Sequence, residues 1–238
     1  MKDQLINELR QELKEKIDPR ALEVSKHFYK EGEEAKVYGI RMAEVHKMGK
    51  HFYQQIKEMP KEDIYEIAEK LWESDYLEET VIACICTELL HKKYEPTDFK
   101  LFEHWVKDYV ADWASCDTLC SQTLGSFIIM YPQYLKELKK WAKSSNRWVK
   151  RAAAVTLILP ARKGLFLNDV FEIANILLLD KDDMVQKGYG WMLKVTSQTY
   201  QKEVYEFVIA NKAIMPRTAL RYAIEKMPPD LRKEAMKK

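Results

Sequence analysis

The chain has 238 residues, 47% of them hydrophobic and 11% aromatic, and a formal net charge of +2. This composition excludes a disordered chain and allows one or two domains with a sizeable core. Only 7 Gly and 8 Pro are present, and this scarcity argues against many tight β-turns and favours helices. Residues 1–17 contain neither a signal-peptide core nor an apolar run that could cross a bilayer, so we expect a cytoplasmic protein without membrane partners.

Apolar residues recur at intervals of three and four along nearly the whole chain, which predicts an all-α protein. The breaks between helices fall at prolines and at short polar steps. The predicted helices span residues 2–16, 19–30, 40–58, 61–73, 77–93, 97–113, 116–131, 134–144, 147–160, 167–180, 184–199, 201–211 and 217–226.

From residue 60 onward the predicted helices come in pairs, and the second helices recur about every 30 to 40 residues, which is the period of helical repeats. Such repeats stack into a solenoid, an α-α superhelix with one continuous concave face. A closed bundle is the alternative, but so many successive pairs favour the solenoid. We therefore expect a single helical-repeat domain over residues 1–238, and so short an array suggests a monomer.

Charge is segregated along the chain. Residues 61–80 carry two Lys against eight Asp or Glu, a net charge of −6, whereas residues 134–163 carry nine Lys or Arg against one Glu, a net charge of +8. Charged helical faces are usually just solvated, but a basic block interleaved with tryptophans such as Trp148 is typical of a surface that binds a polyanion. We favour nucleic acid over a membrane, because no predicted helix combines a basic face with a large apolar one.

The cysteines do not suggest a metal or redox site. None of the four forms a CxxC pair, and the five histidines do not cluster with them. Buried thiols in a reducing cytosol are the simpler interpretation, so we expect neither a metal ion nor a cofactor. The cysteines are Cys84, Cys86, Cys116 and Cys120.

The stretch WASCDTLC at 113–120 places an indole and a carboxylate four residues apart. We expect Trp113 to end one helix and Ser115 to be the N-cap of the next. Asp117 would then lie in a first turn, where the helix dipole favours a charged carboxylate. Acids are common at such positions, so an ordinary helix-start residue is the more frequent explanation.

Two later stretches favour a functional role for Asp117. RWVKRAAAV at 147–155 begins a helix, and its Arg151 could be a surface cation, a phosphate clamp or an orienter of a carboxylate. QKGYGWMLKV at 186–195 places two glycines within a helical pattern, which costs about 1 kcal/mol each relative to Ala. The glycines could permit close helix packing, or close approach of a ligand to Trp191.

These three stretches fall in second helices of successive pairs, and second helices line one face of a solenoid. Trp113, Asp117, Arg151 and Trp191 are therefore predicted to converge.

In this order and spacing, the motifs WxxxD, NxWxxRAA and QKxxGW resemble the DNA alkylation repair family of AlkD-like glycosylases, which are built from HEAT-like repeats. The segments YGIRM at 38–42 and YPQYL at 131–135 are also similar to that family. Each motif is weak alone, but together they are fairly specific. The resemblance covers about residues 20–225.

The resemblance implies a DNA glycosylase that removes cationic N3- and N7-alkylated purines from duplex DNA held in a concave groove, without flipping the base. It implies that Asp117 is the catalytic carboxylate, that Trp113 and Trp191 frame the lesion's deoxyribose, and that Arg151 binds a nearby phosphate. Further DNA contacts are expected from Lys150, Arg147, Trp148, Lys187, Lys194 and Arg41.

Two alternatives stay open. The same scaffold could be a non-catalytic binder of branched or damaged DNA, since the family also contains relatives with little glycosylase activity. It could also be a helical-repeat module that binds a protein, although the basic block makes this the least favoured. Either DNA-binding protein would associate with the nucleoid.

Overall fold

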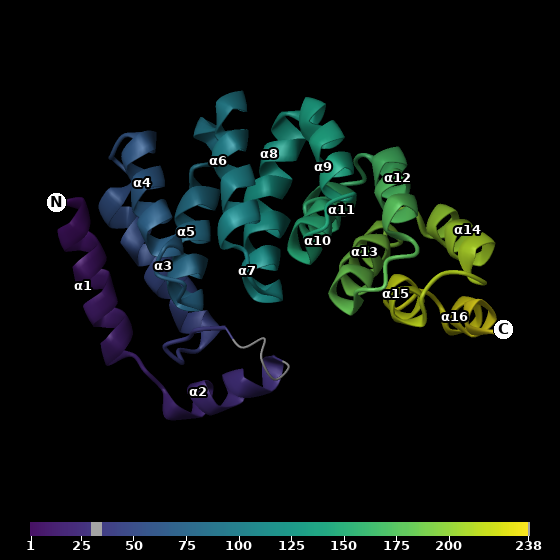
Figure 1. The fold of residues 1–238 in the computed structure, drawn as a ribbon, viewed down its shortest axis with the longest axis horizontal. Coiled ribbons are helices and arrows are strands. Elements are labelled where there is room, and N and C mark those ends of the chain that lie inside the picture. Colours follow the sequence, from purple (N-terminus) through teal and green to yellow (C-terminus); the bar gives the residue numbers. More distant parts are fainter. Residues whose placement is uncertain (30–34, 238) are drawn as a thin grey trace. The chain divides into compact units, whose positions relative to one another are not determined.

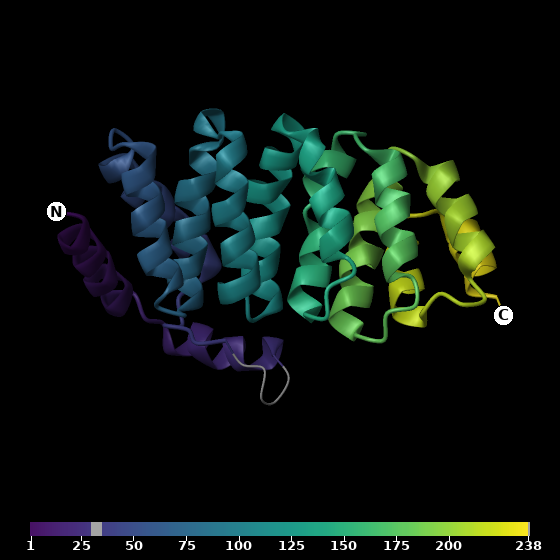
Figure 2. The same cartoon turned by 45° about the horizontal axis from the view of Figure 1, so that its top comes forward.

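A computed structural model describes residues 1–29 and 35–237 (Figure 1 and Figure 2). Over these residues the protein is an all-α helical-repeat structure, which confirms the predicted fold class. The chain divides into two compact units, Met1–Leu119 and Cys120–Lys238. The expectation of a single domain stays a prediction. In the described ranges no helix has the length and apolar character that crossing a membrane requires.

The first unit is built around α5, which packs against both α3 and α4. Figure 1 shows these three helices side by side. Most residues of α5 are buried, including two cysteines and two adjacent glutamates. The α-helices of this unit are α1 (Lys2–Glu15), α2 (Pro19–Ser25), α3 (Met42–Ile56), α4 (Lys61–Trp72), α5 (Leu77–Leu89), α6 (Phe99–His104) and α7 (Trp113–Thr118).

The second unit is built around α13, which packs against α10, α12 and α15. A π-helical turn, Leu119–Leu124, precedes its first helix. The α-helices of this unit are α8 (Gly125–Met130), α9 (Leu135–Trp141), α10 (Arg147–Val155), α11 (Ile158–Arg162), α12 (Leu167–Leu177), α13 (Asp183–Thr196), α14 (Gln201–Asn211), α15 (Arg217–Ala223) and α16 (Pro229–Met236).

Most predicted helices are present, but several predictions were wrong in detail. The helix predicted over 147–160 is two helices, α10 and α11. Helix α16 was not predicted. Pro229 is its first residue, where a missing N–H costs nothing. The helix predicted over 19–30 is α-helical only to Ser25, and its last predicted residue lies outside the described ones.

A further difference lies in the segment predicted as a helix over 97–113. Helix α6 ends at His104 and is followed by a π-helical turn, Trp105–Tyr109. Glu69 of α4 fixes this turn, since its carboxylate accepts hydrogen bonds from the Trp105 indole N–H and, at 2.7 Å, from the Tyr109 hydroxyl. The chain is then extended at Val110, so that a new helix can begin shortly afterwards.

The cysteines and one of the glycines fulfil packing roles. All four cysteines are buried, as predicted, and burial raises the pKa of the Cys86 thiol. Gly190 lies against α15: a Cβ atom there would stand 2.7 Å from Cβ of Tyr222 and 2.9 Å from the carbonyl oxygen of Ala219. Close helix packing therefore explains Gly190.

Replacing Gly190 with Ala should destabilise the protein by about 1–3 kcal/mol, because the new methyl group meets backbone and Cβ atoms that cannot move aside. Gly49→Ala is the matched control. Its Cβ would lie 2.7 Å from Cδ1 of Ile85, the movable end of a side chain, and Ala gains about 1 kcal/mol of helix propensity. Urea denaturation should show a large loss only for Gly190→Ala, and equal losses would contradict this packing argument.

Candidate functional site

The first unit contains a cavity of about 660 Å³ with mostly apolar walls. The walls come from α2, from residues 37–42, from α5 and from α7. The rings of Tyr29 and Trp113 both line it, with centroids 5.9 Å apart and planes tilted by 32°. Two acidic residues also line it, Glu78 and Asp117. A cavity of this size, with few polar groups, is typical of a site for a small ligand or for part of a larger one.

Helix α7 carries Trp113 and Asp117, and its start is set by Asp112. The Asp112 carboxylate accepts hydrogen bonds from the backbone N–H groups of Ala114 (2.7 Å) and Ser115 (3.1 Å) and from the Ser115 hydroxyl (2.8 Å). The prediction that Ser115 is the N-cap was therefore wrong. Trp113 begins this helix instead of ending the previous one.

Because α7 begins at Trp113, Asp117 does not lie where the sequence predicted. Asp117 lies beyond the first turn of α7, so the carboxylate that faces the positive end of the helix dipole is that of Asp112. Residues four apart share a helical face, however. Trp113 and Asp117 consequently line the same cavity, and both are half-buried.

Arg41 lies at the same cavity. Its side chain is 71% exposed and forms an ion pair with Asp18 at 2.9 Å. The wall next to it contains Gly39, whose φ of +89° is favourable only for glycine, and whose missing Cβ lets Leu22 of α2 approach closely. The predicted contact of Arg41 with DNA stays a prediction.

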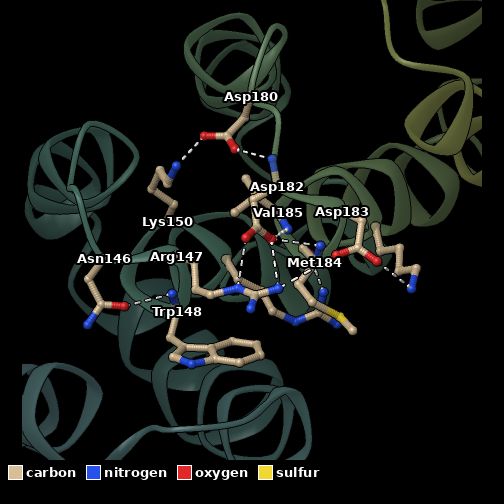
Figure 3. Close-up of polar contacts among 11 residues, drawn as sticks. Asn146, Arg147, Trp148, Lys150, Asp180, Asp182, Asp183, Met184 and Val185 are labelled. Atoms are coloured by element: carbon tan, nitrogen blue, oxygen red, sulfur yellow. Dashed lines mark hydrogen bonds and ion pairs between the residues drawn. The ribbon is translucent and has the colours of Figure 1, made fainter. Parts of the chain in front are cut away.

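In the second unit, predicted DNA-binding residues of α10 lie against the start of α13 (Figure 3). Arg147 forms an ion pair with Asp182, with Nε and Oδ2 2.8 Å apart, and Lys150 pairs with Asp180. The Arg147 guanidinium also lies 4.9 Å from the ring centroid of Trp148. Asp182 is at the same time the N-cap of α13 and accepts hydrogen bonds from two of its backbone N–H groups.

The net charge of +8 counted over residues 134–163 therefore overstates the charge available to a polyanion. Several cations of this block are paired with acidic residues that come after it in the sequence and were not counted. Within the block, Lys139 pairs with Asp169 and Glu172, Arg147 with Asp182 and Asp183, and Lys150 with Asp180. Beyond it, Lys187 pairs with Asp183 and Lys194 with Glu225. Other cations of the block remain exposed at the surface: Lys136, Lys143, Arg162 and Lys163.

Arg151 is buried, with 5% of its surface exposed. Its guanidinium donates a hydrogen bond of 2.5 Å to the carbonyl oxygen of Met184 in α13. Gly188 leaves room for it, since a Cβ atom there would lie 3.1 Å from Cγ of Arg151. Accommodation of this arginine, not approach of a ligand, explains Gly188. Binding of a phosphate by Arg151 stays a prediction.

The structure thus brings Trp113, Asp117 and Arg41 together in the first unit. In the second unit it brings Arg147, Trp148, Lys150 and Arg151 to the contact between α10 and α13, and α13 also carries Lys187, Trp191 and Lys194. Convergence of the two groups stays a prediction. In the described part of the chain, no three His, Cys, Asp or Glu side chains are placed to hold a metal ion.

Sequence reasoning missed three residues that shape the cavity: Tyr29, Glu78 and Asp112. Only Asp112 had a local signal, because Asp is as good an N-cap as Ser and stands directly before Trp113. Tyr29 and Glu78 come from elements distant in the sequence, and no motif marks them.

Comparisons with known proteins agree with the resemblance found in the motifs. A family model described as DNA alkylation repair enzyme matches residues 9–227. A solved structure described as a predicted DNA alkylation repair enzyme from Enterococcus faecalis superposes with a TM-score of 0.77 and 17% sequence identity, over 90% of this chain and 98% of that chain. At this identity the superposition shows the fold alone. No curated protein sequence matches the chain.

Asp182 has two separable contributions to stability. Asp182→Asn keeps a good N-cap but loses the charge that pairs with Arg147, so we expect a loss of about 0.5–1 kcal/mol. Asp182→Ala also loses the cap and should cost about 1 kcal/mol more. Denaturation at low and high salt separates them, since salt should shrink only the ion-pair contribution. Equal stability of the two variants would contradict the capping role.

Proposed function

Because the chain belongs to the DNA alkylation repair enzyme family, we propose that it is a monofunctional glycosylase acting on cationic N3- and N7-alkylated purines in duplex DNA. It hydrolyses the N-glycosidic bond between the damaged base and its deoxyribose. One observation carries this proposal: Trp113 and Asp117 lie one helical turn apart on the wall of an apolar cavity, beside a second aromatic ring, Tyr29.

The residue types suit the reaction. A purine alkylated at N3 or N7 is already positively charged, so it departs as a neutral base and needs no general acid. The difficulty is the positive charge that develops on the sugar as the bond breaks. A fixed carboxylate beside the sugar stabilises that charge and positions the attacking water. One aspartate therefore suffices where cleavage between sugars needs two carboxylates.

The apolar walls strengthen this effect. A carboxylate acts more strongly on a nearby cation when few water molecules screen it. The indole of Trp113 adds a cation–π attraction of about 1 kcal/mol or more when desolvated. The predicted packing of Trp191 against the deoxyribose is part of this proposal, and the base stays in the duplex without being flipped.

Salt-dependent affinity for duplex DNA comes from cations that can release counterions from the phosphates. The exposed cations of the basic block supply most of it, and the ion-paired Arg147 and Lys150 contribute less. Asp182 and Asp180, just before α13, hold Arg147 and Lys150, which keeps their side chains ordered before phosphate binds. The protein acts in this scheme as a cytoplasmic monomer on double-stranded DNA, with DNA along a concave face.

Release of free 7-methylguanine from methylated duplex DNA tests the reaction. Asp117→Asn should lower the single-turnover rate by about 10²–10³-fold, because the stabilising charge is lost, while the Kd for DNA stays close to that of the wild type. Asp112→Asn is the matched control on the same helix. It retains an N-cap and should release the base at nearly the wild-type rate.

Two outcomes would contradict this proposal. If the wild type binds DNA but releases no base, the protein is a non-catalytic binder of damaged or branched DNA. If Asp117→Asn releases the base as fast as the wild type, the reaction depends on another residue.

The ion pairs of the second unit predict which lysines matter for DNA affinity. Replacing the exposed Lys136 and Lys143 with Gln should lower the slope of log K against log salt by about 0.9 for each phosphate that is no longer neutralised. Lys139→Gln should change the slope less, since Asp169 and Glu172 already neutralise Lys139. A larger effect of Lys139→Gln in a binding titration would contradict this assignment.

A further inference from the structure

Two adjacent glutamates at the start of α5 are buried, Glu78 with 1% and Glu79 with 0% of the surface exposed. Burying a carboxylate is costly unless hydrogen bonds or ion pairs compensate it. Consecutive residues of a helix point in directions about 100° apart, so the two side chains have different surroundings. Their partners show what each holds in place.

Glu78 holds a wall of the cavity through the backbone. Its Oε1 accepts hydrogen bonds from the N–H groups of Gly39 (2.8 Å) and Ile40 (3.1 Å), and its Oε2 accepts one from the N–H group of Tyr38 (3.0 Å). Three backbone amides on one carboxylate fix both the position and the orientation of this segment, which has little regular structure of its own.

Glu79 holds α1 through side chains. The Arg10 guanidinium donates to both of its oxygens, with the closest contact at 2.9 Å between Nη2 and Oε2. The Tyr38 hydroxyl donates a further hydrogen bond of 2.7 Å. Glu79 does not line the cavity, whereas Glu78 does.

We propose that Glu78 is a positioning residue for the reaction at Asp117, and this inference rests on the proposed function. Glu78 fixes residues 38–40, of which Gly39 and Ile40 form part of the wall. It also adds a buried carboxylate to the residues around the cavity that contains the half-buried Asp117. A cationic transition state is stabilised by both effects, because the charges are already in place and need no rearrangement.

The neighbouring side chains are consistent with an effect of Glu78 inside the cavity. Burial raises the pKa of Tyr29, and the charges of Asp112 and Glu78 raise it further. Arg20 and Arg41 also line the cavity, but both are exposed, and Arg41 is paired with Asp18. The buried charge that lines the cavity is thus negative.

Glu78→Gln and Glu79→Gln form a matched pair that tests this proposal. Gln at position 78 keeps one oxygen for Gly39 and Ile40 but turns an amide nitrogen toward the Tyr38 N–H, and it removes the charge. We expect a fall of about tenfold or more in the single-turnover rate of base release, with Kd for DNA within about twofold of wild type. Glu79→Gln should lower the Tm of the protein at least as much as Glu78→Gln does. It should nevertheless release the base at nearly the wild-type rate.

Each outcome decides the proposal. An unchanged rate for Glu78→Gln in an active protein overturns it, as do equal losses of rate in both variants. If Glu78→Gln does not fold, Glu78→Asp replaces it: the charge is kept but the reach shortened, so a slower rate at unchanged Kd supports positioning and an unchanged rate overturns it. Absence of release by the wild type is a failure of the proposed function itself, and it removes the positioning role too.

Discussion

The carboxylate of Asp112 forms the hydrogen bonds on which the candidate site depends. By accepting two backbone N–H groups and the Ser115 hydroxyl it fixes where α7 begins. That start determines which residues face the cavity, and it places Trp113 and Asp117 there together. Carboxylates bonded to backbone amides recur in both units: Glu78 holds residues 38–40, and Asp182 begins α13 while it orders Arg147. Such bonds are directional, so they restrict the positions of the residues around a site more than apolar contacts do.

The fold could largely be predicted from the sequence, because the periodicity of apolar residues reports which helical face is buried. The end of α6 at His104 could not be predicted from the sequence. It depends on Glu69, which collects hydrogen bonds from Trp105 and Tyr109, residues 36 and 40 positions away. No local pattern reveals such contacts. Helix α16, which begins at Pro229, was not predicted at all.

The site was predicted in part. Trp113 and Asp117 do line one cavity, but they share a single helix, whereas the sequence predicted a helix boundary between them. The predicted cap and the dipole argument were therefore wrong. The net charge counted over residues 134–163 was also misleading. Arg147 and Lys150 are paired with Asp182 and Asp180, which lie outside the counted residues. The buried Glu78 has no sequence signal at all: its partners are backbone amides, which every residue type except proline provides.

The central claim is that Asp117 stabilises positive charge on the deoxyribose. The most direct measurement is the affinity for duplex DNA with a cationic pyrrolidine in place of one deoxyribose, compared with a neutral tetrahydrofuran at the same position. Wild-type protein should prefer the cationic duplex by at least about tenfold, since it resembles the transition state, and Asp117→Asn should lose that preference while binding the neutral duplex unchanged. Equal affinity of the wild type for both duplexes, or a preference that survives in Asp117→Asn, would contradict the account.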